Sequence, residues 1–313
     1  MKQNRLFQEY NIIGSYIGNF LLKYKKLLKL DSTVLVTGET GTGKELIARW
    51  IHFMDDTRKD SPFVKITIPN IGENIFESEV FGYEKGAFTG AISSKKGLIE
   101  VAENGTVFLD EIENASPSTQ SKLLQLLEDR IYRKVGGTEY MITEARFIVA
   151  TNVDLYEEVK QGRFRSDLFF RLAVLDINIP ALRERGGDLV EISNYYINRF
   201  NHKFNKNIEL FGNTELNELL SYKWPGNIRE LRNFIEKQMV FSESDKLDLS
   251  ELKQRCAAQS TSVGSYKEYM DRAEKEYLER VYKLKNNKVE DVAESISMSA
   301  PFVYKKLKEH GIN

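Results

Sequence analysis

One segment of eight residues, 38–45, restricts the fold more than any other part of the chain. It matches the spacing G-x-x-x-x-G-K, follows an apolar stretch that predicts a strand at 34–36, and precedes a helical pattern at 46–54. Glycines let the backbone N–H groups of such a loop turn inward, and the helix that follows adds the positive end of its dipole. The loop therefore favours a bound phosphate, and a glycine-rich turn without a ligand is the alternative. The expected binding residues are Gly38, Glu39, Thr40, Gly41, Thr42, Gly43, Lys44 and Glu45.

Strand-like and helix-like segments alternate between residues 12 and 175. Apolar stretches predict further strands at 63–68, 106–109, 147–150 and 174–179, with a helix at 118–130. Such alternation predicts an α/β fold with a parallel sheet that helices cover on both faces. The chain beyond residue 180 follows helical patterns, interrupted by a polar stretch. We therefore expect an α/β unit at 1–175, a helical subdomain at 176–250, a linker at 251–265 and a helical unit at 266–313.

The composition excludes several classes of protein. The formal net charge is −1, so contact with nucleic acid requires a local basic patch. The single cysteine, Cys256, permits no disulfide within the chain, and His52, His202 and His310 are too far apart to suggest a zinc site. No apolar run approaches the length of a membrane span, and the first ten residues lack the apolar segment of a secretion signal. We expect a cytoplasmic protein with no membrane partner.

Residues 107–111, Val-Phe-Leu-Asp-Glu, form an apolar strand that ends in two acids. Ligands of a parallel sheet bind at the carboxyl ends of its strands, where these acids would lie. Asp110 suits a magnesium ion, held directly or through water, and Glu111 suits the polarisation of an attacking water in phosphoryl transfer. Acids that only cap a strand are the alternative, which the upstream phosphate loop makes the weaker one. Because Glu45 stands where the motif has Ser or Thr, magnesium depends more on phosphates, water and Asp110.

Four further motifs resemble one family, in that family's order. They are Ser-Glu-Val-Phe-Gly-Tyr-Glu-Lys at 78–85, GAFTGA at 86–91, Pro-Ala-Leu-Arg-Glu-Arg at 180–185 and Trp-Pro-Gly-Asn-Ile-Arg-Glu-Leu at 224–231. Together they resemble the sigma-54-dependent activators, also called bacterial enhancer-binding proteins. The resemblance implies an AAA+ P-loop ATPase with a parallel sheet, a helical lid subdomain and a C-terminal all-α helix-turn-helix domain. It also implies ATP and magnesium as cofactors, and sigma-54 RNA polymerase as a partner.

The GAFTGA hexapeptide has a physical interpretation of its own. Two glycines bracket an aromatic residue and a threonine, so the backbone can bend sharply and lift the aromatic side chain off the surface. A hairpin tip packed on its own protein is the alternative. In the family this loop contacts the sigma factor and moves with the nucleotide state. The resemblance assigns that contact to Gly86, Ala87, Phe88, Thr89, Gly90 and Ala91.

Matching positions imply further roles at the nucleotide. Asn152 follows the strand at 147–150 and resembles the sensor of the γ-phosphate, while Arg229 matches the sensor in the lid. Ile13 and Gly14 match the segment that lines the adenine pocket. Thr67 stands where the family commonly has an Asn that restrains the catalytic Glu. Its shorter hydroxyl reaches less far, so we expect a weaker restraint.

Two arginines point to assembly. Arg165 and Arg171 match the family's arginine fingers, which a neighbouring subunit supplies in trans to stabilise transition-state charge. A finger in trans makes hydrolysis depend on a homo-oligomeric ring, and we expect a hexamer. A salt bridge on the helix surface is the alternative for each arginine.

The C-terminal segment is similar to a Fis-type helix-turn-helix. Helices are expected at 288–296 and 300–308, with Ser299 as the cap of the second and Pro301 in its first turn. Six lysines against four acids from residue 283 onward give a net charge of +2, which favours double-stranded DNA. A small oligomerisation module is the alternative. The residues expected at DNA are Ser299, Phe302, Tyr304, Lys305, Lys306 and Lys308.

The leading hypothesis is an ATP-dependent transcriptional activator that binds an upstream DNA site and remodels sigma-54 RNA polymerase. A DNA-binding repressor with a regulatory ATPase, an AAA+ unfoldase or loader, and a nucleotide-gated scaffold are the rivals. The intact GAFTGA disfavours the first two, and the acids at 110 and 111 disfavour the third. Because the ATPase motifs begin near Ile13, we expect regulation by a partner in trans or by a segment upstream of this chain.

Overall fold

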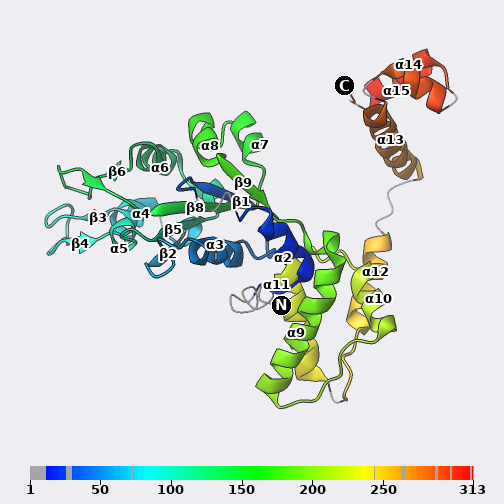
Figure 1. Ribbon diagram of the computed structural model, residues 1–313, viewed down its shortest axis with the longest axis horizontal. Helices are drawn as coiled ribbons and strands as arrows, with labels where there is room; N and C mark the ends of the chain where they lie inside the picture. The colour runs from blue at the N-terminus through cyan, green and yellow to red at the C-terminus, as the bar shows by residue number, and fades with distance from the viewer. Residues whose placement is uncertain are drawn as a thin grey trace. The chain divides into compact units, whose positions relative to one another are not determined.

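The computed structural model describes residues 12–25, 30–71, 73–242, 244–261, 266–285, 288–296, 298–310 and 312. The chain folds as two compact units, Met1–Leu249 and Ser250–Asn313 (Figure 1). Among the described residues, no helix combines the length and the apolar character that crossing a membrane requires.

The centre of the first unit is a parallel sheet of five strands in the order β2-β5-β8-β1-β9. Its carboxyl ends lie in register, since Thr37 pairs with Thr151 and Asn178, and Thr67 pairs with Asp110. This confirms the predicted α/β fold and gathers the loops that follow the strands at one edge. The strands are β1 (Val34–Thr37), β2 (Phe63–Thr67), β5 (Thr106–Asp110), β8 (Arg146–Thr151) and β9 (Leu175–Asn178).

The alternation of side chains along each strand divides the core into two layers. Phe108 belongs to the cluster that includes α3 and α2, whereas Val107 and Leu109 belong to the opposite cluster, which includes α6 and α8. Figure 1 shows α3 on one side of the sheet and α6, α7 and α8 on the other. Each fully buried aliphatic side chain stabilises the fold by about 1.5–3 kcal/mol. The helices are α2 (Ser15–Leu22), α3 (Lys44–Phe53), α4 (Glu73–Val80), α5 (Leu98–Val101), α6 (Pro117–Asp129), α7 (Leu155–Lys160) and α8 (Ser166–Leu172).

Two short hairpins, whose strands the sequence patterns did not predict, project from the sheet. One pairs β3 (Gly82–Tyr83) with β4 (Lys95–Lys96), and the other pairs β6 (Ile131–Tyr132) with β7 (Met141–Ile142). Strands of two residues are too short to display a period of two, which explains why they were missed. Val135 joins the hairpins, because its N–H donates to Gly82 O at 2.9 Å and its carbonyl accepts from Glu84 N at 3.0 Å.

The helical subdomain packs around a buried tryptophan. Trp224 is 0% exposed, donates its indole N–H to Leu219 O at 2.8 Å and contacts the ring of Phe234 edge-on. The subdomain contains α9 (Gly186–Phe204), α10 (Asn213–Ser221) and α11 (Asn227–Phe241), and we call it the lid. Short 3₁₀ turns lie at η2 (Ile68–Asn70), η3 (Ile112–Asn114) and η4 (Leu182–Glu184), the last of which leads into α9.

The second unit is helical, with α12 (Ser250–Thr261), α13 (Tyr266–Leu284), α14 (Val289–Ser295) and α15 (Ala300–Glu309). Leu278, Val292, Val303 and Leu307 form its core. The predicted linker at 251–265 is helical up to residue 261, where α12 ends, and residues 262–265 lie outside the described residues. The segment is polar but rich in helix formers, and Glu251 pairs with Arg255 at 2.7 Å one turn later.

Candidate active site

The loop at 38–43 joins β1 to α3 and lies against the lid. Gly38, Gly41 and Gly43 have φ values of 147°, 81° and 100°, which side chains disfavour. A Cβ on Gly41 would lie 2.2 Å from Gly226 O, so a side chain there would collide with the lid backbone. Glycine at 41 thus allows both the turn and the close approach of the lid.

Lys44 begins α3 and folds back over this loop. Its Nζ donates to Gly38 O at 2.7 Å and to Glu39 O at 3.2 Å. Burial lowers the pKa of Lys44, and the nearby acids Asp110 and Glu113 oppose that shift. The loop lysine therefore lies within electrostatic reach of Asp110, the acid that ends β5.

A lysine that no motif pointed to links two of the predicted residues. Lys65 of β2 lies 3.2 Å from Asp110 Oδ2 and 2.7 Å from Glu45 Oε2. Burial alone would raise the pKa of Glu45, but hydrogen bonds from Lys65 and Arg49 outweigh it and hold that pKa below its ordinary value. Asp110 and Glu45 thus share one cation. Among the described residues, no group of three or more His, Cys, Asp and Glu side chains is placed to hold a metal ion.

Glu111 has φ 58° and ψ 51°, in the left-handed region that a residue with a side chain rarely adopts. Such strain is common at functional sites, where the surrounding structure maintains it. The main-chain carbonyl of Glu111 accepts a bond from Asn114 Nδ2 at 3.4 Å, and within the described part of the chain no hydrogen bond joins Thr67 to Glu111. The nearby Glu113 is held instead, because Thr151 at the end of β8 donates to its Oε2 at 2.8 Å.

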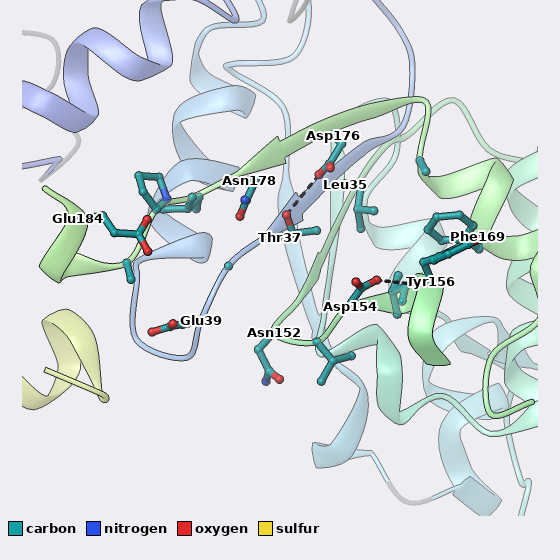
Figure 2. A pocket seen from close by; sticks show the side chains of 17 residues that line it. Leu35, Thr37, Glu39, Asn152, Asp154, Tyr156, Phe169, Asp176, Asn178 and Glu184 are labelled. Carbon is teal, nitrogen blue, oxygen red and sulfur yellow. Dashed lines mark hydrogen bonds between the residues drawn. The ribbon is translucent and has the colours of Figure 1, made fainter. Parts of the chain in front are cut away.

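A cavity of about 480 Å³ opens at the carboxyl ends of β1, β8 and β9. Figure 2 shows Thr37 hydrogen-bonded to Asp176 of the neighbouring strand, with Asn152 beyond the end of β8 and Glu39 on the glycine loop. Asn152, the expected sensor, is exposed and lines this cavity. The structure therefore places Asn152 and Glu39, from distant parts of the sequence, at one site.

A smaller apolar pocket, of about 40 Å³, lies on the lid side of the loop. Ile13 lines it, together with Ile12, Ile17, Leu46 and Ile228. Gly14, the next residue, is not among the residues that line this pocket. Its φ is 123°, and a Cβ there would lie 2.3 Å from Asp188 Cγ. Gly14 instead leaves room for Asp188, which accepts the N–H groups of Tyr16 and Ile17 at the start of α2.

The three predicted arginines have different surroundings. Arg229 is exposed in the first turn of α11, and its Cβ lies 3.1 Å from where a Cβ on Gly41 would stand. Arg165 is 47% exposed and pairs with Asp167 at 2.7 Å, with a further bond to Ser121 Oγ. Arg171 donates twice to the carbonyl of Leu127, at 3.0 and 2.6 Å. Arg165 thus faces solvent, whereas Arg171 also supports the end of α6.

The GAFTGA residues form the centre of the loop between β3 and β4, which we call the 84–94 loop. Gly86 and Gly90 have φ values of 84° and 101°, and Gly86 N donates to Ala91 O at 2.9 Å. Phe88 rests edge-on against Tyr83 with ring centroids 5.0 Å apart, yet it remains 46% exposed. Ala91 is buried and Thr89 is exposed. One part of the Phe88 ring therefore packs against Tyr83, and the rest is accessible to solvent.

Most of the residues expected at DNA have exposed side chains, and one forms an ion pair within the unit. Phe302, Tyr304, Lys305 and Lys308 are exposed, so Phe302 is not part of the core of this unit. Lys306 instead pairs with Glu274 of α13 at 3.0 Å. Ser299 occupies the N-cap position of α15 but makes no side-chain capping bond, which corrects the expected cap.

Comparisons with known proteins agree with this geometry. Residues 15–178 match the family of the Sigma-54 interaction domain, and residues 183–268 match an AAA+ ATPase lid domain. The chain is 36% identical to the Nitrogen fixation protein AnfA of Azotobacter vinelandii, over 98% of this chain and 58% of that protein. It is 44% identical to the Nif-specific regulatory protein of Klebsiella pneumoniae, over 72% of this chain and 42% of that protein. The chain spans about half the length of these relatives.

A solved structure has the same fold. NtrX from Brucella abortus, crystallised in complex with ATP, superposes with a TM-score of 0.70 at 29% identity, over 96% of this chain and 69% of that one. The family match extends over more than half of the chain and includes the glycine loop, the strand-end acids and the 84–94 loop. The chain therefore belongs to the Sigma-54 interaction domain family, joined to an AAA+ lid.

Proposed function

We propose that this chain hydrolyses ATP and uses the hydrolysis to remodel sigma-54 RNA polymerase at promoters, which activates transcription. The observation that carries the proposal is the pairing of a complete phosphate loop with an intact GAFTGA whose Phe88 and Thr89 are exposed. Membership of the family and the likeness to nitrogen-fixation regulators support it. The repressor alternative has no comparable observation in its favour.

Hydrolysis is assigned to the residues at the end of the sheet. The inward N–H groups of the glycine loop and Lys44 bind the phosphates. Glu111 polarises the attacking water, and Asn152 reads the γ-phosphate from the end of β8. Arg229 reaches the phosphates from the lid, and Ile13 packs against the adenine in the apolar pocket.

Magnesium is the metal ion proposed for this site. The chemistry of the donors fits it, because the carboxylates of Asp110 and Glu45 already share one cation, the ammonium of Lys65. Asp110 would hold the ion, with phosphates and water as further ligands, and the ion supplies neutralisation of phosphate charge.

A homo-oligomeric ring, proposed to be a hexamer, completes the site. Arg165 is the stronger candidate for a finger in trans, because it is exposed and its partner Asp167 lies only two residues away. An exposed pair of this kind contributes little stability, so it opens easily toward a neighbouring subunit. Arg171 is the second candidate.

The second unit is proposed to bind double-stranded DNA upstream of the promoter. Tyr304, Lys305 and Lys308 present hydrogen-bond donors on α15, which suits contact with phosphates. Ser299 and Phe302, at the start of the same helix, lie where base edges would be read. Lys306 is the weakest member of the set, because Glu274 holds it.

Two substitutions distinguish ATP hydrolysis from the contact with the sigma factor. Glu111→Gln is expected to retain ATP binding but to lose hydrolysis by about 100-fold or more, because it removes the base that positions water. Phe88→Ala is expected to keep hydrolysis within about twofold, because its ring lies outside the nucleotide site, and to abolish promoter opening. The measurements are ATP turnover and transcription from a sigma-54 promoter with purified components. A Phe88→Ala protein that opens the promoter at the normal rate would refute the proposed function.

A further inference from the structure

The lid binds the outer side of the phosphate loop at three consecutive carbonyls. Asn227 Nδ2 donates to Thr40 O, the N–H of Ile228 donates to Gly41 O, and Arg185 donates to Thr42 O, each at 3.0 Å. The C=O and N–H of one peptide unit point in opposite directions. Carbonyls held by the lid therefore direct the N–H groups that follow them to the inner side of the loop, where the Thr42 N–H donates to Glu39 O at 3.4 Å and an anion could replace that acceptor.

A carboxylate of the loop strengthens this attachment. Glu39 accepts two bonds from Arg183, at 2.9 and 2.5 Å, and one from Asn227 Nδ2 at 3.0 Å. Hydrogen bonds from Arg183 and then Asn227 lower the pKa of Glu39 to about 2, so it is ionised at neutral pH. The pair with Arg183 is partly exposed and would contribute little alone. The amide of Asn227 is fully buried, which makes it the central contact.

Asn227 is suited to hold both sides at once. Its Oδ1 accepts the N–H of Leu182 at 2.8 Å, so its Nδ2 is the atom that faces Glu39 and Thr40. Its φ is 50°, a left-handed conformation that Asn tolerates better than most residues. One buried side chain thus joins η4, the start of α11 and the phosphate loop. Arg229 lies two residues further along α11, so the same contact sets the position of that arginine.

We propose that Glu39, Arg183 and Asn227 form a clamp that positions the phosphate loop for nucleotide binding and transmits the position of the lid to it. These are positioning residues, because none of them needs to touch the nucleotide. The inference rests on the proposed nucleotide binding and names the residues that prepare the site for it. Without the clamp, the loop amides would no longer be held inward before the phosphate arrives.

An isosteric exchange tests the clamp. Asn227→Asp places a carboxylate oxygen where Nδ2 meets Glu39 and Thr40 O, so a donor becomes a repelling acceptor. We expect the Kd for fluorescently labelled ADP to rise about tenfold or more, as for a lost buried charge-assisted bond. Glu39→Gln alone is expected to change it by about threefold or less, since the Gln carbonyl still accepts from Asn227.

The double variant supplies the decisive outcome. In Asn227→Asp with Glu39→Gln, the new Gln amide donates to the new carboxylate, while the repulsion at Thr40 O remains, so affinity should recover in part, by about threefold or more over Asn227→Asp. Glu236→Gln is the matched control, because it breaks an ion pair with Lys203 inside the lid and contacts no part of the loop. Normal affinity in a folded Asn227→Asp protein, or no recovery in the double variant, would overturn the clamp.

A second readout keeps the clamp distinct from the proposed function. Hydrogen exchange of the amides of residues 39–43 is measured without nucleotide. The clamp predicts faster exchange in Asn227→Asp than in the parent and a return toward the parent rate in the double variant. A parent protein that does not bind ADP would defeat the proposed function but leave the exchange test valid. Unchanged exchange in Asn227→Asp would defeat the clamp alone.

Discussion

The phosphate loop and the 84–94 loop both turn on glycines with positive φ, but their surroundings differ completely. A Cβ on Gly41 would lie 2.2 Å from the lid backbone, whereas a Cβ on Gly86 or Gly90 would meet no atom within 4 Å. Glycine in the phosphate loop is therefore required for contact as well as for conformation. In the 84–94 loop it is required for conformation alone.

The polar contacts of the two loops differ in the same way. Donors from the lid hold three carbonyls of the phosphate loop, while the bonds of Gly86 and Ala91 stay within the 84–94 loop. A loop fixed from outside retains the geometry that chemistry needs. The 84–94 loop has fewer contacts from outside, namely the bond from Glu84 N to Val135 O and the packing of Gly136 on Ala87, so it can change position at lower cost. The comparison teaches that the same residue type serves precision in one loop and motion in the other.

The largest effect is expected at Gly41. Gly41→Ala combines a steric overlap with the carbonyl of Gly226 and a backbone conformation that alanine disfavours. Each term costs about 1–3 kcal/mol, so nucleotide affinity should fall by about 100-fold or more. Calorimetric titration with ADP measures it.

Gly162→Ala is the matched control for strain, since its φ is 71° and no atom lies within 4 Å of its Cβ position. It should lower stability by about 1 kcal/mol and leave nucleotide affinity unchanged. Equal losses of affinity in the two variants would mean that contact with the lid does not distinguish the phosphate loop.

A smaller effect is expected at Gly136, where promoter activation should fall and nucleotide binding should not. This residue of the β6–β7 hairpin packs on the 84–94 loop, and a Cβ there would lie 2.7 Å from Ala87 Cβ. Gly136→Ala should displace the 84–94 loop without reaching the nucleotide, so promoter activation should fall about tenfold while ATP turnover stays within about twofold. Both are measured on one preparation.

The adjacent Gly137 provides the control. Its nearest neighbour would be Lys134 O at 3.2 Å, and Gly137→Ala should change activation by less than about twofold. Parallel losses of turnover and activation in Gly136→Ala would show that the two loops are not mechanically separate.

Local patterns were sufficient to predict the sheet. Each of its five strands lies within one residue of its expected bounds. Runs of β-branched and aromatic residues between turn residues are typical of strands, which explains the agreement. The position of the phosphate loop, Asp110 and Asn152 at the carboxyl edge of the sheet could also be predicted, since each lies at or just after the end of a strand. α12 was missed because a helix with few apolar residues resembles a linker in composition.

The contacts that complete the site could not be predicted, because they join segments far apart in sequence. Asn227 donates to Glu39, which lies 188 positions away in the sequence. The residues around either one do not indicate this contact. Lys65 occupies an exposed position of β2, where a lysine ordinarily faces water. The close contact of Gly14 with Asp188 of α9 likewise joins residues far apart in sequence. The folded lid brings Asn227 to Glu39 and Asp188 to Gly14, whereas the sheet and α3 bring Lys65 to its two acids.

The smallest expected effect is on the pH dependence of stability, to which Glu39 of the phosphate loop should contribute and Glu84 of the 84–94 loop should not. The pKa of Glu39 falls from 4.5 to about 2 on folding, mainly through hydrogen bonds from Arg183 and Asn227. A depressed carboxyl pKa contributes stability that is complete above about pH 4.5 and is lost as the pH falls toward 2. Because the Glu39 side chain is 42% exposed, solvent screening reduces this contribution to about 0.5–1 kcal/mol.

Urea unfolding of the parent and of Glu39→Gln, at pH values from 7 to 3.5, measures this contribution. The stability difference between them should be greatest at pH 7, remain constant to about pH 5 and shrink below about pH 4.5, because acid neutralises Glu39 in the parent and has no effect on Gln. Glu84→Gln is the counterpart at the 84–94 loop, where the acid meets only Lys134 at 3.7 Å. It should change stability by a few tenths of a kcal/mol at most, as an exposed ion pair does. A Glu39→Gln difference that grows as the pH falls would reverse the sign of the argument, because it would mean that the protonated carboxyl is the form that the lid binds.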